Sequence, residues 1–255
     1  MSLEADYLGA FEEHSADGIR HALAAGASAT ALIKGKTPID CLIEGYLRSP
    51  QFGACLRILL DAGAAIEDPL LEAVLLDDDS AVQRFVNTGE DLNRKLRIPC
   101  AFTSCQGVTA LHICAEFNCV KCARVLLQAG ADVNARANID ADGFGGQTPI
   151  FHAVNSIFNY CRPTLELLVE AGAHLDVRLK GLVWGAGADW ETLLLDVTPI
   201  SYAQCGLYAQ FHRREHDVYS NLSYLYRKRY VATLPVRNVP NKYLAPKPLG
   251  GRGDR

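Results

Sequence analysis

The chain has 255 residues, of which 49% are hydrophobic and 21% are charged. This balance is typical of folded proteins and too apolar for intrinsic disorder. The net charge of −4 argues against a general nucleic-acid binder, which needs a continuous basic surface. No apolar run reaches the ~20 residues of a transmembrane helix, and the first residues do not resemble a secretory signal. We therefore expect a cytoplasmic protein that binds neither nucleic acid nor membrane.

The cysteines and the distribution of charge add two expectations. Nine cysteines, an odd number without disulfide-scaffold spacing, favour free thiols in a reducing compartment. Residues 213–255 carry ten Lys or Arg against three Asp or Glu, whereas the rest of the chain carries fifteen against twenty-six. This asymmetry leaves open that the chain binds itself, although we expect a monomer.

An apolar helical stretch that stops at a glycine recurs along the chain. The glycines are Gly26, Gly63, Gly89, Gly130 and Gly172. Apolar residues stand three, four and seven positions before each of them, and these offsets share one face of an α-helix. A glycine just past that face indicates a left-handed C-cap, so the pattern predicts a helix and its end in each unit.

A second recurring sequence pattern, or phrase, predicts a shorter helix that precedes the longer helix of each unit after the first. Its capping residues are Thr37, Asp68, Thr109, Thr148 and Thr198, each followed by Pro or Ala and then an aliphatic residue. A Thr or Asp side chain can accept a hydrogen bond from an amide of the first turn. Proline suits the first helical position, because its missing N–H has no helical partner there. Each unit is thus predicted to be a helix, a turn, a second helix and a glycine stop.

The two phrases together resemble the ankyrin-repeat family, most closely at Gly107–Ala115 (GVTALHICA) and Ala123–Ala135 (ARVLLQAGADVNA). The resemblance implies an all-α fold, an ankyrin-repeat α-solenoid within residues 1–230. It implies about six helix–turn–helix repeats joined by β-hairpin links, with the first and last repeats as caps. The expected repeats are 5–29, 36–66, 68–93, 107–135, 146–176 and 197–228.

Three links between repeats are longer than the regular ankyrin turn. They run from Asn93 to Gly107, from Ala135 to Gly146 and from Asp176 to Val197. The last predicts a β-hairpin near 177–196 with a tryptophan on each side of its tip. Two readings of the hairpin stay open: it extends the partner-binding surface, or its tryptophans cover the core of the array. Residues 231–255, with four prolines, are predicted to be an extended basic tail.

The resemblance implies a non-catalytic module that recognises another protein. In the family, the concave face formed by the first helices grips partners together with the turn tips, and here we expect the long links to contribute. We expect no cofactor, no metal ion and no catalytic residue. The candidate partner-binding residues are Phe102, Asp140, Phe144, Arg178, Lys180, Trp184 and Trp190.

The alternative is a ligand- or zinc-binding protein, or an enzyme built on the same residues. Its candidate residues are Cys100, Cys105, Cys119, Cys122, His212 and His216. Paired cysteines at such spacings occur in zinc sites. Against this, Cys122 occupies a position where other units carry small residues, so the repeat pattern alone explains it. Only Cys100 and Cys105 have no explanation in the repeat.

Overall fold

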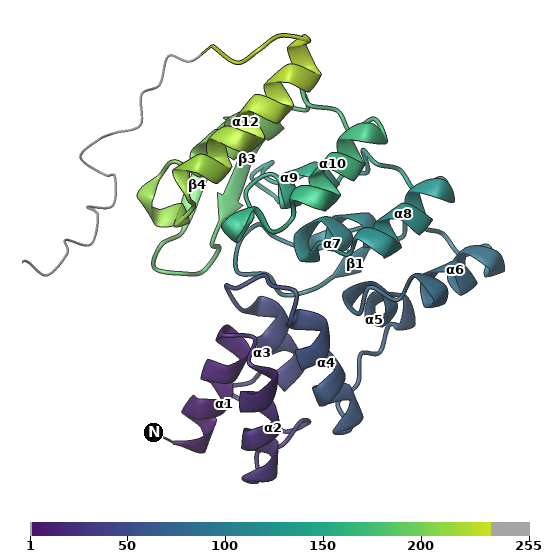
Figure 1. Cartoon of the computed structure of the whole chain (residues 1–255), viewed down its shortest axis with the longest axis vertical. Coiled ribbons are helices and arrows are strands. Elements are labelled where there is room, and N and C mark those ends of the chain that lie inside the picture. The colour runs from purple at the N-terminus through teal and green to yellow at the C-terminus, as the bar shows by residue number, and fades with distance from the viewer. Residues whose placement is uncertain (1, 236–255) are drawn as a thin grey trace, which may run out of the picture.

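The computed structural model describes residues 2–235, so of the predicted tail 231–255 all but residues 231–235 lie outside the described part. Twelve α-helices within these residues form six consecutive pairs (Figure 1). The pairs are α1 (Leu3–Glu12) and α2 (Ala16–Ala24), α3 (Pro38–Glu44) and α4 (Phe52–Asp61), α5 (Pro69–Leu75) and α6 (Asp79–Thr88), α7 (Ala110–Phe117) and α8 (Val120–Gln128), α9 (Pro149–Ala153) and α10 (Arg162–Glu170), and α11 (Pro199–Cys205) and α12 (Glu215–Tyr230).

The helix ends follow the predicted signals. All five stop glycines have a positive φ, between +76° and +101°, the left-handed conformation that ends a helix. Thr37 accepts from the amide of Asp40, and Asp68 accepts from the amides of Leu70 and Leu71. Local capping chemistry therefore sets where these helices begin and end.

The helix pairs stack side by side with one break in the stack. First helices α5, α7, α9 and α11 contact one another in sequence, and second helices α6, α8 and α10 do the same. α1 and α2 pack on α3 and α4 in the same manner. Between α3/α4 and α5/α6 the contacts are sparse, and Figure 1 shows α1–α4 as a block beside the longer stack. The array therefore turns at this point.

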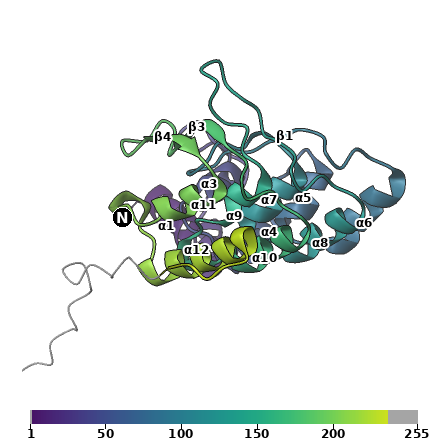
Figure 2. The same cartoon turned by 90° about the horizontal axis from the view of Figure 1, so that it is seen from above.

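The three long links lie together on one side of the array, opposite the second helices (Figure 2). The first link contains strands β1 (Leu96–Arg97) and β2 (Gln106–Val108), and the third contains β3 (Leu179–Trp184) and β4 (Thr192–Val197). We call residues 93–107, 135–146 and 177–197 the link layer.

Backbone hydrogen bonds join the three links to one another. The amide of Asn138 donates to the carbonyl of Gln106 at 3.1 Å, and the amide of Gly145 donates to Gly181 at 2.9 Å. β3 and β4 pair antiparallel, from Leu179 with Val197 to Trp184 with Thr192. The links thus stabilise one another. The β3–β4 hairpin gains support that it would lack if it stood alone in water, where an isolated hairpin is only marginally stable.

Candidate functional site

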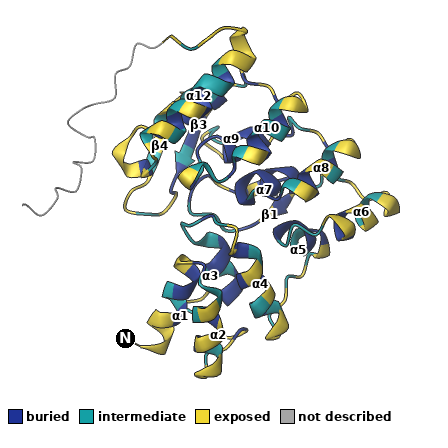
Figure 3. Cartoon of the chain, in the orientation of Figure 1, coloured by how far each residue is buried: buried dark blue, intermediate teal, exposed yellow. Residues whose placement is uncertain are grey.

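Helices α7 and α9 are buried on every side. All eight residues of α7 and all five residues of α9 are buried, and both helices are dark blue in Figure 3. A helix at the surface of an array should leave one face exposed. Something must therefore cover the first-helix face, which we expected to be open to a partner.

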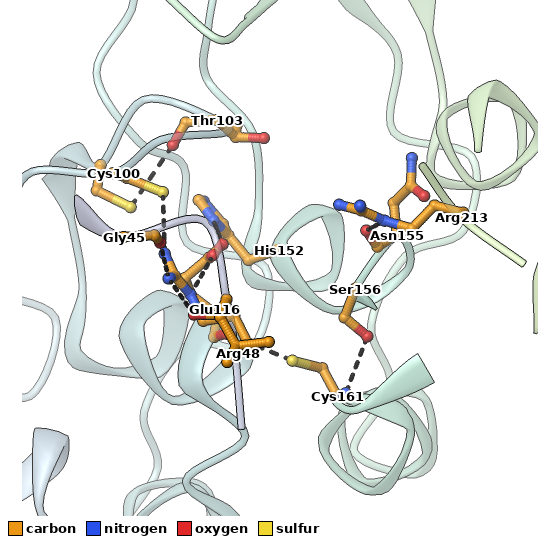
Figure 4. Close-up of polar contacts among 12 residues, drawn as sticks. Gly45, Arg48, Cys100, Thr103, Glu116, His152, Asn155, Ser156, Cys161 and Arg213 are labelled. Atoms are coloured by element: carbon orange, nitrogen blue, oxygen red, sulfur yellow. Dashed lines mark hydrogen bonds and ion pairs between the residues drawn. The ribbon is translucent and has the colours of Figure 1, made fainter. Parts of the chain in front are cut away.

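The segment between α3 and α4 covers this face through Arg48. The Arg48 side chain is 1% exposed, and its Nε donates to Oε1 of Glu116 in α7 at 3.0 Å (Figure 4). Its Nη1 donates to the carbonyl of Gly45 at 2.6 Å. The guanidinium carbon lies 4.4 Å from the ring centroid of Phe117 and 5.2 Å from that of Phe102, so aromatic rings flank the charge.

Glu116 also holds His152 of α9. Nδ1 of His152 lies 3.0 Å from Oε2 of Glu116, so both carboxylate oxygens have a partner. Burial alone would raise the pKa of Glu116, but the charge of Arg48 and the hydrogen bond from His152 lower it below its ordinary value. Glu116 is therefore an ionised carboxylate that joins α7, α9 and the α3–α4 segment.

A second set of contacts joins the α3–α4 segment to the last helix pair. The hydroxyl of Tyr46 donates to the carbonyl of Phe211 at 3.1 Å. Arg213 donates from Nη1 to the same hydroxyl at 3.2 Å and from Nε to the carbonyl of Asn155 at 2.6 Å. Between the two sets of contacts, the cavity lined by Arg48, Glu116, Asn155 and Arg213 among others measures only about 10 Å³. The chain's own residues thus fill the first-helix face around α7, α9 and α11.

The structure separates the seven candidate partner-binding residues by exposure. Phe102 and Trp184 are buried, at 7% and 1% exposure. The Trp184 ring stacks on Phe211 with centroids 4.0 Å apart, so for Trp184 the hairpin covers the core of the array. Neither side chain offers surface to a partner.

The other five candidates lie at the surface of the link layer. Asp140, Arg178, Lys180 and Trp190 are exposed, and Phe144 is partly buried. Oδ1 of Asp140 accepts from the amides of Asp142 and Phe144, so its carboxylate shapes the turn of the second link. The ammonium of Lys180 lies 5.4 Å from the Phe144 ring. The layer thereby brings residues of the second and third links together.

Several residues important to this arrangement were missed in the sequence. Arg48, Tyr46 and Glu116 belong to no repeated phrase, and their partners lie far along the chain. Leu193 and Leu195 are exposed on β4 while Leu194 between them is buried. The sequence did indicate exposed leucines here, because three consecutive leucines in a strand must place leucine on both of its faces.

The residues of the zinc or enzyme alternative fall in separate places and do not come together in one site. Cys100 and Cys105 lie beside Arg48, whereas Cys119 and Cys122 lie beside Asp77. His212 and His216 are both exposed. Within residues 2–235, no group of three or more His, Cys, Asp or Glu side chains is placed to hold a metal ion.

Comparison with known proteins identifies the class. A family model described as ankyrin repeats, in three copies, matches residues 48–137 and 70–179. The matches together cover just over half of the 255 residues, and the chain belongs to the ankyrin-repeat family. No curated protein sequence matches the chain. In the part that the structure describes, none of the helices combines the length and apolar composition needed to cross a bilayer.

Proposed function

We propose that this ankyrin-repeat protein is a non-catalytic, monomeric scaffold of the cytoplasm that binds another protein through the outer surface of its link layer. The observation that carries the proposal is a set of exposed apolar side chains on that layer. They are Ile139, Trp190, Leu193 and Leu195, at 58%, 37%, 47% and 65% exposure. Several exposed apolar side chains on one layer of a folded protein are typical of an interaction surface.

A hollow in the link layer supports the proposal. It has a volume of about 280 Å³ and lies between the second and third links, with Ile139, Phe144 and Val183 in its wall. Val183 pairs with Leu193 across the hairpin, which brings β4 next to the hollow. A pocket beside exposed aliphatic residues suits an apolar or aromatic anchor from a partner. Asp140 lines the hollow and Lys180 lies over Phe144 in its wall, so both supply charge beside it, as in the polar rim of an interface, while Arg178 adds charge elsewhere on the layer.

The rigidity of the layer also supports binding. The amide of Gly185 donates to the carbonyl of Phe102 at 2.8 Å, which ties the hairpin to the first link. Trp184 anchors the same end of the hairpin in the core. A surface that is already ordered loses less conformational entropy when it binds. In this proposal the filled face of α7 and α9 supports the link layer and is not itself the recognition surface.

We further propose that all six helix pairs are ankyrin units, including those outside the matched residues. Supporting this, Thr198 caps α11 as Thr37 caps α3, and Gly26 follows α2 with a positive φ, as the other stop glycines do after their helices. The first and last units would then protect the ends of the stack.

The proposed surface is tested with a double variant, Leu193→Ser with Leu195→Ser. Proteins captured from a lysate of the native host by the wild type are identified, and their affinities for purified variants are measured. We expect the double variant to lose affinity by about tenfold or more. Two leucines that a partner buries on binding together contribute about 1.4 kcal/mol or more to the binding free energy.

The matched control is Leu32→Ser, because Leu32 is 66% exposed but lies outside the link layer. This variant should bind as the wild type does, and thermal unfolding should show that all variants are folded. Unchanged affinity of the double variant would move the interface elsewhere. Sizing at low and high salt should give the mass of one chain, and a larger salt-sensitive species would contradict the monomer.

A further inference from the structure

Cys100 and Cys105 lie together in the loop that connects β1 with β2. The amide of Ile98 donates to the carbonyl of Cys105 at 3.2 Å and closes the loop around the two cysteines. The Cys105 thiol donates to the carbonyl of Thr103 at 3.7 Å, and the side chains of Cys100 and Cys105 are near enough to influence each other electrostatically. Both are free thiols. Two thiols are therefore held next to each other on one short loop.

The two thiols differ in access and in their neighbours. Cys100 is partly exposed, whereas Cys105 is 1% exposed. Nη2 of Arg48 lies 3.8 Å from Sγ of Cys100 (Figure 4). A guanidinium at this place sets a positive charge and an N–H donor beside the sulfur of the more exposed of the two cysteines. Cys100 is thus the thiol placed to react with a small dissolved oxidant.

We propose that Cys100 and Cys105 form a reversible intrachain disulfide when the protein meets hydrogen peroxide, with Cys100 reacting first and Cys105 resolving. In the first step the Cys100 thiol loses its proton to water, and its sulfur attacks one peroxide oxygen. The O–O bond breaks, the leaving hydroxide takes up a proton to become water, and Cys100 becomes a sulfenic acid.

In the second step the sulfur of Cys105 attacks the sulfur of Cys100. The S–O bond of the sulfenic acid breaks, and the departing hydroxide leaves as water with the proton of Cys105. Two thiols and one peroxide thus give one disulfide and two waters. The neighbouring thiol of Cys100, and then burial, raise the pKa of Cys105 well above its ordinary value. This fits a thiol that stays protonated until its neighbour has been oxidised.

The pair Cys119 and Cys122 provides a comparison within the same chain. Both are buried at the start of α8, and no arginine contact to either sulfur is present among the described residues. Burial first, and then the nearby carboxylate of Asp77, raise the pKa of both thiols. Nothing in this environment favours a thiolate, so this pair should remain reduced when Cys100 and Cys105 are oxidised.

Oxidation would act on a junction of the molecule. The loop that holds the two thiols carries Phe102, whose ring lies over Arg48 and whose carbonyl accepts from Gly185 of the hairpin. A covalent bond across this loop would restrict the segment between the buried ion pair and the link layer. We therefore expect amides of residues 98–105 to exchange more slowly in the oxidised protein than in the reduced protein.

The test treats the full-length wild type with hydrogen peroxide in the absence of reductant. Free thiols are then alkylated under denaturing conditions, and peptides are mapped by mass spectrometry. We expect a Cys100–Cys105 peptide that has lost two hydrogens and that dithiothreitol restores, while Cys119 and Cys122 are fully alkylated. Oxidation of Cys100 to sulfinic acid without the cross-link would overturn the proposal, as would equally fast oxidation of Cys119 and Cys122.

Variants separate the two roles. Cys105→Ser should leave a sulfenic acid on Cys100 that dimedone traps, and Cys100→Ser should abolish the cross-link. Cys122→Ser should form the cross-link at the wild-type rate. Trapping of a sulfenic acid on Cys105 in Cys100→Ser at the wild-type rate would contradict the assigned order. If a serine variant does not fold, the wild-type peptide map still decides whether the disulfide forms.

Discussion

Arg48 is a charged side chain in a place from which burial ordinarily excludes charge. Removing an arginine and a carboxylate from water costs several kcal/mol for each ion. The cost is offset here because Glu116, the Gly45 carbonyl and the rings of Phe102 and Phe117 surround the guanidinium. Such a pair depends on both members, since loss of one leaves an unpaired charge in the core.

We predict that Arg48→Met destabilises the protein by about 3–5 kcal/mol, the cost of leaving a buried charge without its partner. Adding Glu116→Gln to Arg48→Met should recover part of this loss, because the unpaired charge is then removed. The measurement is the free energy of unfolding in urea. Arg20→Met is the control, since Arg20 is 59% exposed and pairs with exposed Asp17, and it should change stability by less than about 0.5 kcal/mol.

A second prediction at this scale concerns pH and His14. Burial, and then the charge of Arg48, lower the pKa of His14 from 6.5 to about 4. Between these values the unfolded chain binds a proton that the folded protein does not, so stability falls as the pH drops from about 6.5 to about 4. Above 6.5 this group has no effect on the pH dependence.

His14→Asn should therefore lose less stability than the wild type between pH 6.5 and pH 4. Asparagine suits the position because His14 has a positive φ of 49°, which asparagine tolerates. Urea unfolding across this pH interval measures the difference. His216→Asn, at a histidine with an 89% exposed side chain, should keep the wild-type slope. Equal slopes for wild type and His14→Asn would show that His14 is not the group responsible.

At the scale of elements, the link layer depends on close backbone approach at Gly145. Gly145 has a φ of +99°, and a Cβ there would lie 2.6 Å from the carbonyl oxygen of Asn138. Gly187, at the hairpin tip, has a φ of +80° but nothing within 4 Å of such a Cβ. The two glycines share the backbone conformation and differ in the space around them.

Alanine at either glycine should cost about 1–2 kcal/mol for the left-handed backbone. Gly145→Ala should cost at least about 1 kcal/mol more, because the added methyl group clashes with a backbone that must then move. Thermal and urea unfolding of both variants provide the measurement. Similar losses for both would mean that the second link adjusts without strain.

The elements also show what the sequence could and could not predict. Stop glycines and Thr or Asp caps act within one helix, so their positions predicted helix ends correctly at Gly89 and Thr37. Burial of Trp184 depends on another segment, because Phe211, which covers it, lies 27 positions away in the sequence. The repeat pattern describes how a unit packs on its neighbours, and so it contains no information on the 68-residue separation between Arg48 and Glu116.

At the scale of the whole molecule, each helix pair packs on its neighbours in the stack, and two pairs that are not neighbours also contact each other. In an ordinary ankyrin array each repeat contacts only the repeats next to it. Here Tyr46, between α3 and α4, bonds to Phe211, 165 residues further along the chain. The second and sixth pairs are thereby connected without the pairs between them.

This connection predicts how a core defect spreads. Leu168→Ala in α10 should cost about 2–5 kcal/mol, because Leu168 is fully buried. Hydrogen exchange should rise first in α8 and α12, the neighbouring units, and also in residues 45–51, which the defect reaches through Phe211 and Arg213. Unchanged protection of residues 45–51 would indicate that the array responds as an open stack.

The contact between Tyr46 and Phe211 also limits how such a gene can change in length. An open solenoid tolerates duplication or deletion of a whole unit, since each new neighbour offers the same surface. Deleting one of the pairs between Tyr46 and Phe211 would shift one contact partner by about 8–10 Å, the spacing of packed helices, and separate the two residues. The number of units between them is therefore constrained, whereas units added beyond the last pair would leave the contact intact.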